Sequence, residues 1–361
     1  MIRTIALFRA LYLGDMLLAV PALRALRQRF PEAEITLIGL PWAAELVEHY
    51  PAYLDRFVPF EGYPGLPEVE VKRRQTRTFL RAQRAYRYDL AVQMHGSGAS
   101  SNAFVRDLRA KLSVGYFPPG DKAARKRLDI GEPYPADQHE IERNLGLARL
   151  LGATRLDPRL EFPLLERDVQ ECERLLETLS RKDRLWIGLH AGAKCPARRW
   201  PPAYFAQLAD ALADKLGARI LLTGSAGEAA TVRQVADQMS SKPLNLVGKT
   251  SLGGLAALLS RLDLFISNDT GPAHLASALD TPSITLMGPT DYQRWSAQNQ
   301  QRHPVLRAPV ACSPCAHQVC PIDHRCLNLI RPALVEEVAS ELLRQNPALF
   351  YRHRRNMPVS L

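Results

Sequence analysis

The sequence predicts an α/β protein made of two Rossmann-like domains that face each other, with the active site in the cleft between them. Short apolar runs alternate with helical stretches, which is typical of parallel strand–helix–strand units with helices on both faces. This pattern begins near residue 4 and begins again near residue 185. The 361 residues are also long enough for two hydrophobic cores. We therefore expect domains at 1–165 and 184–361, joined by a charged, helix-like linker at 166–183.

The individual elements follow from the same pattern. In the first half, we expect strands at residues 4–8, 35–39 and 89–93, and a helix at 16–30. In the second half, the apolar runs predict strands at residues 185–190, 219–223, 264–267 and 283–287. Open α/β sheets bind their ligands at the carboxyl ends of the strands, so we expect the functional residues in the loops that follow these runs.

Composition indicates a globular protein without a membrane span. Hydrophobic residues make up 46% of the chain and charged residues 23%. No apolar run reaches the 18 residues that a spanning helix needs. The first 15 residues hold only a short apolar patch, interrupted by Arg9 and Asp15, which does not fit a signal peptide. We expect a cytoplasmic protein whose six cysteines are reduced unless they bind a metal.

Positive charge is concentrated in one segment. The net charge is +10, and residues 72–127 alone contain 14 basic and three acidic residues. Such a surface fits an anionic partner: nucleic acid, anionic lipid or a phosphorylated glycan. If residues 71–86 form a helix, their spacing places Arg73, Arg77, Arg81 and Arg84 on one face. A solvated helix face is the alternative.

The stretch 264–275 carries the clearest functional signal. An apolar strand is followed by Thr270, which suits an N-cap, and by Pro272 in a first helical turn. Gly271 lets a ligand approach the backbone. The resulting helix N-terminus attracts a diphosphate, and the polar groups of Asp269 and His274 flank it. An ordinary capped connection between a strand and a helix is the alternative.

Residues 266–274, together with Gly-Pro-Thr at 288–290, closely resemble the signature of the bacterial lipopolysaccharide heptosyltransferase family, glycosyltransferase family 9. The resemblance covers nearly the whole chain and includes Leu-Gly-Asp at 13–15, Pro-Ala-Leu at 21–23 and the segment 192–201. It implies the GT-B arrangement of two facing Rossmann-like domains, ADP-heptose as donor, and inversion at the anomeric carbon without a catalytic metal. In agreement, the sequence has no Asp-x-Asp motif.

The resemblance also implies roles for individual residues. Asp15 matches the proposed catalytic base; without the resemblance, an N-cap role would be preferred. Glu228 matches the acid at the nucleotide ribose, and Thr250 falls where the base is held. The positions that hold the diphosphate and donor sugar are matched by Asp269, Thr270, Gly271 and His274, and Asp269 is also expected to be catalytic.

One position departs from the family. Relatives often carry a lysine two residues before Trp200, and here that residue is Arg198. Arginine keeps the positive charge and can bind two phosphate oxygens, but it does not lose its proton at physiological pH. We expect Arg198 to stabilise the departing diphosphate, and nearby Lys194 is the alternative cation.

Four cysteines, in the pattern C-x2-C-x4-C-x5-C, fall within 15 positions near the end of the chain. In a reducing compartment such a group can bind zinc or iron, and similar segments hold iron in some proteins related to the resembled family. A candidate structural metal site therefore consists of Cys312, Cys315, Cys320 and Cys326, with a loop of unligated thiols as the alternative. We expect no cofactor in catalysis itself.

Three other functions compete with glycosyl transfer. A nucleotide-sugar epimerase has the same fold but needs no basic surface for a lipid-linked acceptor. A nucleic-acid binder is disfavoured because no helix-turn-helix, RNP or basic-zipper pattern is present. A dinucleotide oxidoreductase is disfavoured because the first strand lacks a Gly-x-Gly-x-x-Gly turn. The partners expected are therefore a nucleotide diphosphate sugar, an anionic glycolipid acceptor (lipid A with its acidic core sugars) and the inner-leaflet membrane surface.

Overall fold

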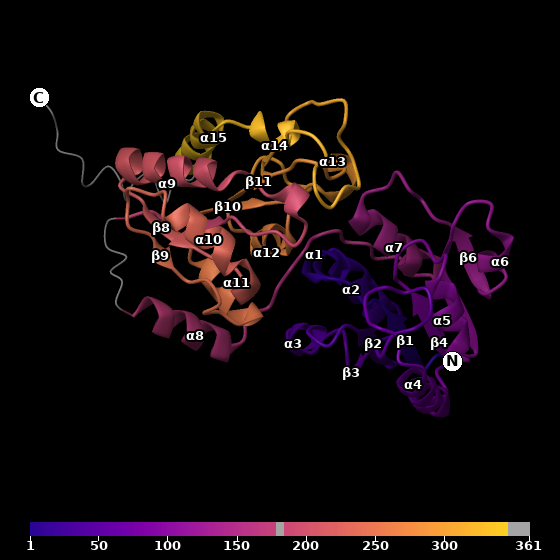
Figure 1. Cartoon of the computed structure of the whole chain (residues 1–361). Helices are drawn as coiled ribbons and strands as arrows, with labels where there is room; N and C mark the ends of the chain where they lie inside the picture. Colours follow the sequence, from indigo (N-terminus) through magenta and orange to yellow (C-terminus); the bar gives the residue numbers. More distant parts are fainter. Residues whose placement is uncertain (178–183, 346–361) are drawn as a thin grey trace, which may run out of the picture. The chain divides into compact units, whose positions relative to one another are not determined.

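The computed structural model describes residues 1–177 and 184–345. The chain divides into two compact units, Met1–Pro163 and Leu164–Leu361, and Figure 1 shows a sheet with flanking helices in each. Each sheet has six strands, and every pairing within it is parallel. The predicted α/β fold with two Rossmann-like domains is confirmed.

The first unit has the strand order β3-β2-β1-β4-β5-β6. Its strands are β1 (Thr4–Phe8), β2 (Glu34–Gly39), β3 (Arg56–Pro59), β4 (Leu90–Gln93), β5 (Leu112–Phe117) and β6 (Ile130–Pro133). Its helices are α1 (Leu13–Leu17), α2 (Val20–Arg29), α3 (Ala43–Glu48), α4 (Arg73–Tyr86), α5 (Ser101–Asp107), α6 (Lys122–Arg125) and α7 (Glu140–Leu150). The central strand β1 is apolar and almost wholly buried because helices cover both faces of a parallel sheet.

The helix expected at residues 16–30 is two helices, α1 and α2. The break lies at Leu18 and Ala19, just before Pro21 near the start of α2. Proline has no backbone N–H and cannot bond to the carbonyl four residues earlier, so one continuous helix through this point is disfavoured. The expectation of a single helix was wrong, and Asp15 lies inside α1 rather than at its N-cap, which is Tyr12.

The second unit has the strand order β12-β11-β10-β7-β8-β9. Its strands are β7 (Trp186–His190), β8 (Arg219–Leu222), β9 (Leu244–Asn245), β10 (Leu264–Asn268), β11 (Ser283–Leu286) and β12 (Val305–Leu306). Its helices are α8 (Glu166–Leu176), η1 (Pro196–Arg198), α9 (Pro202–Leu216), η2 (Ala226–Glu228), α10 (Ala229–Ala236), α11 (Leu252–Ser260), α12 (Gly271–Ala278), α13 (Tyr292–Trp295), α14 (Arg325–Asn328) and α15 (Pro332–Arg344). Trp200 is fully buried in its core, and its indole N–H donates to the carbonyl of Ile330 over 2.9 Å.

Helix α8 occupies most of the segment expected to be a linker, and it packs against α11 of the second unit. The carboxylate of Glu171 accepts hydrogen bonds from the backbone N–H and the hydroxyl of Ser251, at 2.7 and 2.6 Å. Ser251 is the N-cap of α11, so this negative charge lies at the positive end of that helix. The remainder of the expected linker, residues 178–183, lies outside the described residues. Among the described residues, no helix is both long and apolar enough to span a bilayer.

Candidate donor and acceptor sites

In the second unit, polar side chains from three adjacent strands lie where a sugar donor is expected to bind. His190 ends β7, Thr223 follows β8, and Asp269 follows β10, and these strands are neighbours in the order β10-β7-β8. Carboxyl ends of parallel strands lie at the same edge of a sheet. The structure therefore gathers these side chains at the edge where open α/β sheets bind ligands.

Arg198 and Asp269, both expected to be catalytic, form an ion pair. The nearest guanidinium nitrogen lies 3.3 Å from Asp269 Oδ2. The Asp269 side chain is only 4% exposed, whereas that of Arg198 is 40% exposed. Oδ2 is buried and accepts no hydrogen bond within the described residues, so the contact is ionic without hydrogen-bond alignment. The pair thus presents a partly exposed cation beside a carboxylate oxygen that has unused acceptor capacity.

The loop that carries Arg198 is fixed to the sheet by Asn268, whose role the sequence analysis missed. Asn268 is fully buried, and its amide donates to the carbonyls of Ala191 and Gly192 at 2.9 and 3.2 Å. Its side-chain oxygen accepts the N–H of Trp200 at 2.9 Å. A buried asparagine in the motif next to Asp269 was the available signal, because a buried amide needs several partners.

Helix α12 begins where the sequence predicted, with Thr270 at the N-cap position and Pro272 in the first turn. The Thr270 side chain makes no capping bond and donates to the carbonyl of Asn268 instead. The first-turn N–H groups therefore lack a side-chain cap, which suits an anion at this helix end. His274 is buried in the same helix, with its ring 6.5 Å from that of Trp295.

Glu228 lies at the end of η2 and is bound from two sides. Its Oε2 accepts the N–H and the hydroxyl of Ser225 at 2.7 and 2.8 Å, and its Oε1 lies 3.6 Å from His190 Nε2. Burial alone would raise the pKa of Glu228, but the close contact with His190 and its charge, followed by the bonds from Ser225, outweigh burial and lower the pKa to about 2. Glu228 is therefore an ionised acceptor at neutral pH.

Gly192 lies directly under this carboxylate. A Cβ atom on Gly192 would be 2.1 Å from Glu228 Oε1, so any side chain there would displace this carboxylate. Thr250, expected to hold the base, is partly exposed and immediately precedes the N-cap of α11. Lys194 is exposed, and Arg198 contacts the Asp269 carboxylate.

Asp15 belongs to the first unit, within α1 after β1. The guanidinium of Arg9 donates two hydrogen bonds to the Asp15 carbonyl, at 3.1 and 2.7 Å. Arg9 is 2% exposed, pairs with Glu140 at 3.4 Å and donates to Asn144 Oδ1 at 3.1 Å. This buried polar network fixes the backbone at Asp15. The sequence analysis noted Arg9 only as a charge within an apolar patch and missed its role.

Comparison with known proteins identifies the family. Residues 76–325 match the family described as Glycosyltransferase family 9 (heptosyltransferase). The chain belongs to this family. It is accordingly a glycosyltransferase.

Three relatives of this glycosyltransferase match it over almost their whole lengths. Lipooligosaccharide heptosyltransferase 2 of Campylobacter jejuni is 25% identical over 341 residues, which is 93% of this chain and 97% of the relative. A solved family 9 glycosyltransferase of Veillonella parvula matches with a TM-score of 0.81 and 22% identity, over 95% of this chain and 98% of that chain. The ADP-heptose lipopolysaccharide heptosyltransferase II of Escherichia coli matches with a TM-score of 0.75 and 23% identity, over 95% and 99%. A UDP-N-acetylglucosamine 2-epimerase is more distant, with a TM-score of 0.50 and 10% identity over 99% and 92%.

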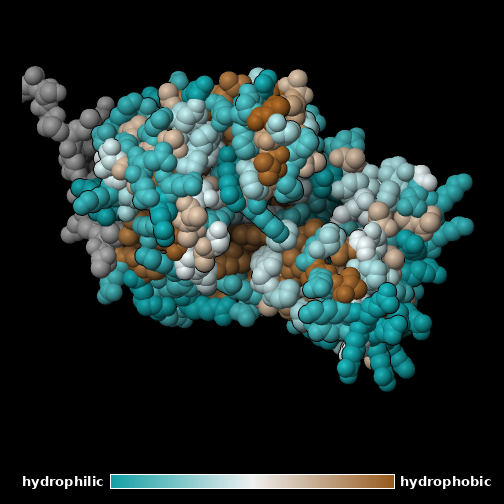
Figure 2. Space-filling model, viewed as in Figure 1, coloured by the Kyte–Doolittle hydropathy of each residue, from teal (hydrophilic) through white to brown (hydrophobic). Residues whose placement is uncertain are grey.

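The basic stripe of this glycosyltransferase lies on α4 in the first unit. Arg73, Arg77 and Arg81 are exposed and form no ion pair within the described residues, whereas Arg84 pairs with Asp107 at 3.6 Å. Figure 2 shows strongly hydrophilic side chains projecting over this helix. Helix α4 connects β3 to β4 and runs antiparallel to the strands. Its first residue, Arg73, is therefore nearest the carboxyl ends of the strands. Arg81 is about 12 Å farther along, at 1.5 Å per residue.

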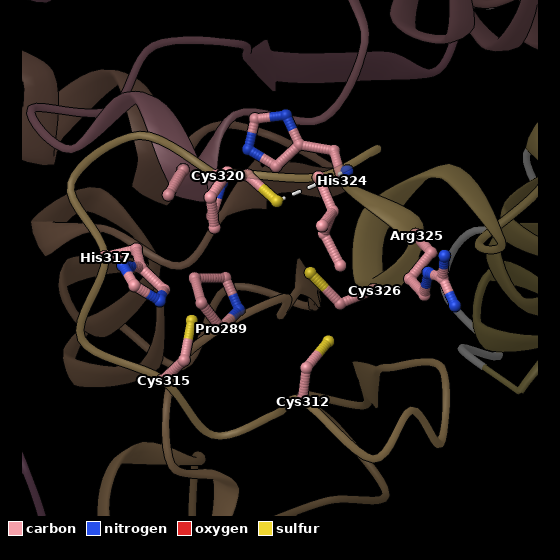
Figure 3. Close-up of a pocket in the computed structure, with 11 residues that line it drawn as sticks. Pro289, Cys312, Cys315, His317, Cys320, His324, Arg325 and Cys326 are labelled. Atoms are coloured by element: carbon pink, nitrogen blue, oxygen red, sulfur yellow. Dashed lines mark hydrogen bonds between the residues drawn. The ribbon is translucent and has the colours of Figure 1, made fainter.

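The four late cysteines line one pocket, together with His317 and His324 (Figure 3). Burial raises the pKa of Cys326, and the nearby charges of Cys312, Cys320 and Cys315 raise it further. Thiols suit zinc or iron, but the described part of the chain contains no group of three or more His, Cys, Asp or Glu arranged to hold a metal ion. Metal binding therefore remains a prediction.

The cysteine segment contacts the loop of Arg198. The carbonyl of Gln318 accepts the backbone N–H of Ala197 at 3.0 Å and the thiol of Cys195 at 3.5 Å. On its other side, the segment reaches the Gly-Pro-Thr loop, where the N–H of Cys315 donates to the carbonyl of Pro289 at 2.8 Å. The conformation of the cysteine segment therefore affects the position of the Arg198 guanidinium.

Proposed function

We propose that this family 9 glycosyltransferase transfers heptose from ADP-heptose to an anionic, lipid-linked glycan such as the lipopolysaccharide inner core. We assign the donor to the second unit and the acceptor to the first. The main support is the ion pair of Arg198 and Asp269 beside the uncapped N-terminus of α12, which together offer a cation, helix N–H groups and a buried acceptor oxygen. The names of the relatives supply the sugar and the nucleotide.

The proposed reaction is a single displacement with inversion. The carboxylate of Asp15 takes the proton from an acceptor hydroxyl while that oxygen attacks the anomeric carbon. The bond from this carbon to the diphosphate oxygen breaks on the opposite face, and the electron pair leaves with ADP. No metal is needed because Arg198 and the helix N-terminus offset the developing charge.

Arg198 stabilises charge in this scheme and donates no proton, since a guanidinium stays protonated at neutral pH. Asp269 keeps Arg198 at the site, and its Oδ2 remains able to accept a hydroxyl of the donor sugar. Glu228 would hold the ribose, and Thr250 the base. Lys194 is the secondary cation, and the experiment on Arg198 described below distinguishes the two.

The exposed arginines of α4 support two parts of the proposal. These are an anionic acceptor and binding of the enzyme at the cytoplasmic face of the membrane. Arg73 lies near the carboxyl ends of the strands, where its guanidinium can form a bidentate contact with an acidic sugar or a phosphate. Arg77 and Arg81 lie farther along the helix and are better placed to contact lipid phosphates. Each basic residue near an anionic surface contributes about 1 kcal/mol, so we propose a cytoplasmic enzyme peripherally bound to the inner membrane.

A donor screen tests the proposal. The full chain is heated with ADP-, GDP-, UDP- or dTDP-linked sugars, and the melting temperature is compared with that of the free protein. Binding to the native state stabilises it according to occupancy, so ADP-heptose should give the largest rise. Incubation with ADP-heptose and deacylated inner-core acceptor should then release ADP. Epimerisation of a UDP-sugar without transfer to any acceptor would contradict the proposal and favour the epimerase alternative.

A further inference from the structure

Each ring nitrogen of His190 lies close to the oxygen of a different side chain. Its Nδ1 lies 3.1 Å from Thr223 Oγ1, and its Nε2 lies 3.6 Å from Glu228 Oε1. The Thr223 hydroxyl donates its own hydrogen to the carbonyl of Leu189 at 3.3 Å, so toward His190 it can only accept. Nδ1 therefore carries a hydrogen. Nε2 faces Glu228 Oε1, and an ionised carboxylate can only accept in such a contact.

The two oxygens of Glu228 are held by different parts of the fold. Ser225, three residues earlier, binds Oε2 in a capping box, which is a local arrangement within one turn. His190 comes from the neighbouring strand β7 and approaches Oε1. Ser225 alone leaves the carboxylate free to rotate about this anchor. The additional contact with His190 fixes the direction in which the remaining lone pairs point.

This carboxylate is placed to contact a ligand. The Glu228 side chain is 16% exposed, while that of His190 is only 5% exposed. On the other side, the carboxylate lies against the bare Cα of Gly192 in the loop that leads to Arg198. A group that binds over this loop thus meets Glu228 and not His190.

We infer that His190 is a positioning residue that orients Glu228 to accept hydrogen bonds from the vicinal hydroxyls of the donor ribose. The inference rests on the proposed assignment of Glu228 to the ribose. It makes His190 a determinant of ribonucleotide over deoxyribonucleotide binding, through a residue that does not itself touch the ligand.

The test compares ligands that differ only in these hydroxyls. Calorimetry on the full chain gives the affinities for ADP, 2′-deoxy-ADP and 3′-deoxy-ADP. His190→Phe keeps an aromatic ring near Phe265, whose ring centroid is 6.4 Å away, but removes both ring nitrogens. His190→Gln restores one N–H donor toward Glu228. Thr223→Val removes only the partner of Nδ1.

The wild type should prefer ADP over the deoxy analogues by about 10-fold, as expected for hydrogen bonds to a charged group. In His190→Phe, ADP binding should weaken until this preference is lost, while the deoxy analogues bind as before. His190→Gln should recover part of the preference, and Thr223→Val should lose a smaller part. If His190→Phe does not fold, the Gln and Val variants still decide the question.

Two results would overturn the inference. If His190→Phe weakens all three ligands equally, His190 supports the fold rather than the direction of Glu228. If Glu228→Gln abolishes the preference for ADP while the His190 variants retain it, Glu228 binds the ribose without help from His190. A wild type and a Glu228→Gln variant with the same preference would instead refute the assignment of Glu228 to the ribose, and with it this part of the proposed function.

Discussion

Arg198 lies 3.3 Å from Asp269, and this ion pair joins the loop after β7 to the loop after β10. The aspartate is buried and the arginine is partly exposed. Removing the arginine therefore has two separate effects. It removes a cation from the donor site, and it leaves a buried carboxylate without its counter-ion.

We predict that Arg198→Ala lowers both turnover and melting temperature. Turnover should fall by about 100- to 1,000-fold, which corresponds to about 2.7–4 kcal/mol for one preorganised charge-stabilising group. The double variant Arg198→Ala/Asp269→Asn should regain melting temperature but not turnover, because the buried charge is gone and the cation is still missing. Rates of ADP release and thermal unfolding are measured on the same samples. If Lys194→Ala reduces turnover more than Arg198→Ala does, Lys194 is the main diphosphate cation.

Replacing Asp15 should affect chemistry without affecting the donor. Asp15→Asn keeps the size of the side chain and its place in α1, but an amide cannot accept the acceptor proton. We expect turnover to drop by roughly 100- to 10,000-fold, with the Kd for ADP unchanged. Single-turnover kinetics and calorimetry measure these two quantities. Turnover within threefold of the wild type would remove Asp15 from the mechanism.

The arginines of α4 should influence only the acceptor and the membrane. Arg77→Glu/Arg81→Glu should raise the acceptor KM and weaken co-sedimentation with anionic vesicles, and leave the donor KM unchanged. Both effects should shrink with added salt, because exposed charges are screened beyond about 10 Å at 0.1 M ionic strength. The matched control is Arg174→Glu/Arg233→Glu, which makes the same charge change at exposed residues of the second unit. Equal behaviour of the two double variants would mean that α4 is a solvated face.

Metal at the cysteine pocket is tested by elemental analysis. Protein purified without chelator should contain about one zinc or iron per chain, and Cys312→Ser/Cys315→Ser should contain none and melt at a lower temperature. Turnover should fall as well, because this segment contacts the loop of Arg198. Cys172→Ala, a change to a buried thiol elsewhere in the unit, controls for metal content. Metal-free wild type with unaltered melting temperature and turnover would contradict this prediction.

The lowered pKa of Glu228 predicts a contribution to acid stability. Its pKa is about 2 in the folded protein and ordinarily 4.5, so the ionised form is favoured by folding. This contribution is fully present above pH 4.5 and is lost as the pH falls from 4.5 toward 2. Urea unfolding between pH 6 and pH 3 should show a smaller loss of stability in Glu228→Gln than in the wild type. Glu32→Gln, at an exposed position, should lose as much as the wild type.

The parts of the fold that the sequence predicted are the ones whose patterns are local. The inner strands β1, β7, β10 and β11 are short, largely apolar runs, and the expected ranges agree with them to within about one residue. Strands β3, β5, β6, β9 and β12 were missed, and in β9 and β12 two residues are too few to show a pattern. The break before Pro21 was also missed, although the missing N–H of proline was a usable signal.

The candidate site likewise contains some contacts that could be predicted from the sequence and others that could not. Asp269, Thr270 and Gly271 lie within one contiguous motif, so their proximity could be predicted. The pairing of His190 with Glu228 spans 38 positions and depends on β7 and β8 being neighbours, which no local pattern reveals. The same holds for Arg9 and Glu140, which meet across 131 positions.

The position of α8 determines where an independently expressed donor half has to begin. A fragment starting at the strand of Trp186 would discard Glu171, and the first backbone N–H and the hydroxyl at the start of α11 would lose their acceptor. It would also remove Cys172 and Leu176, two buried side chains of α8. The surface of α11 against which α8 packs would then be exposed. A fragment that begins at Leu164 keeps both, so the natural cut point lies before this helix and not after it.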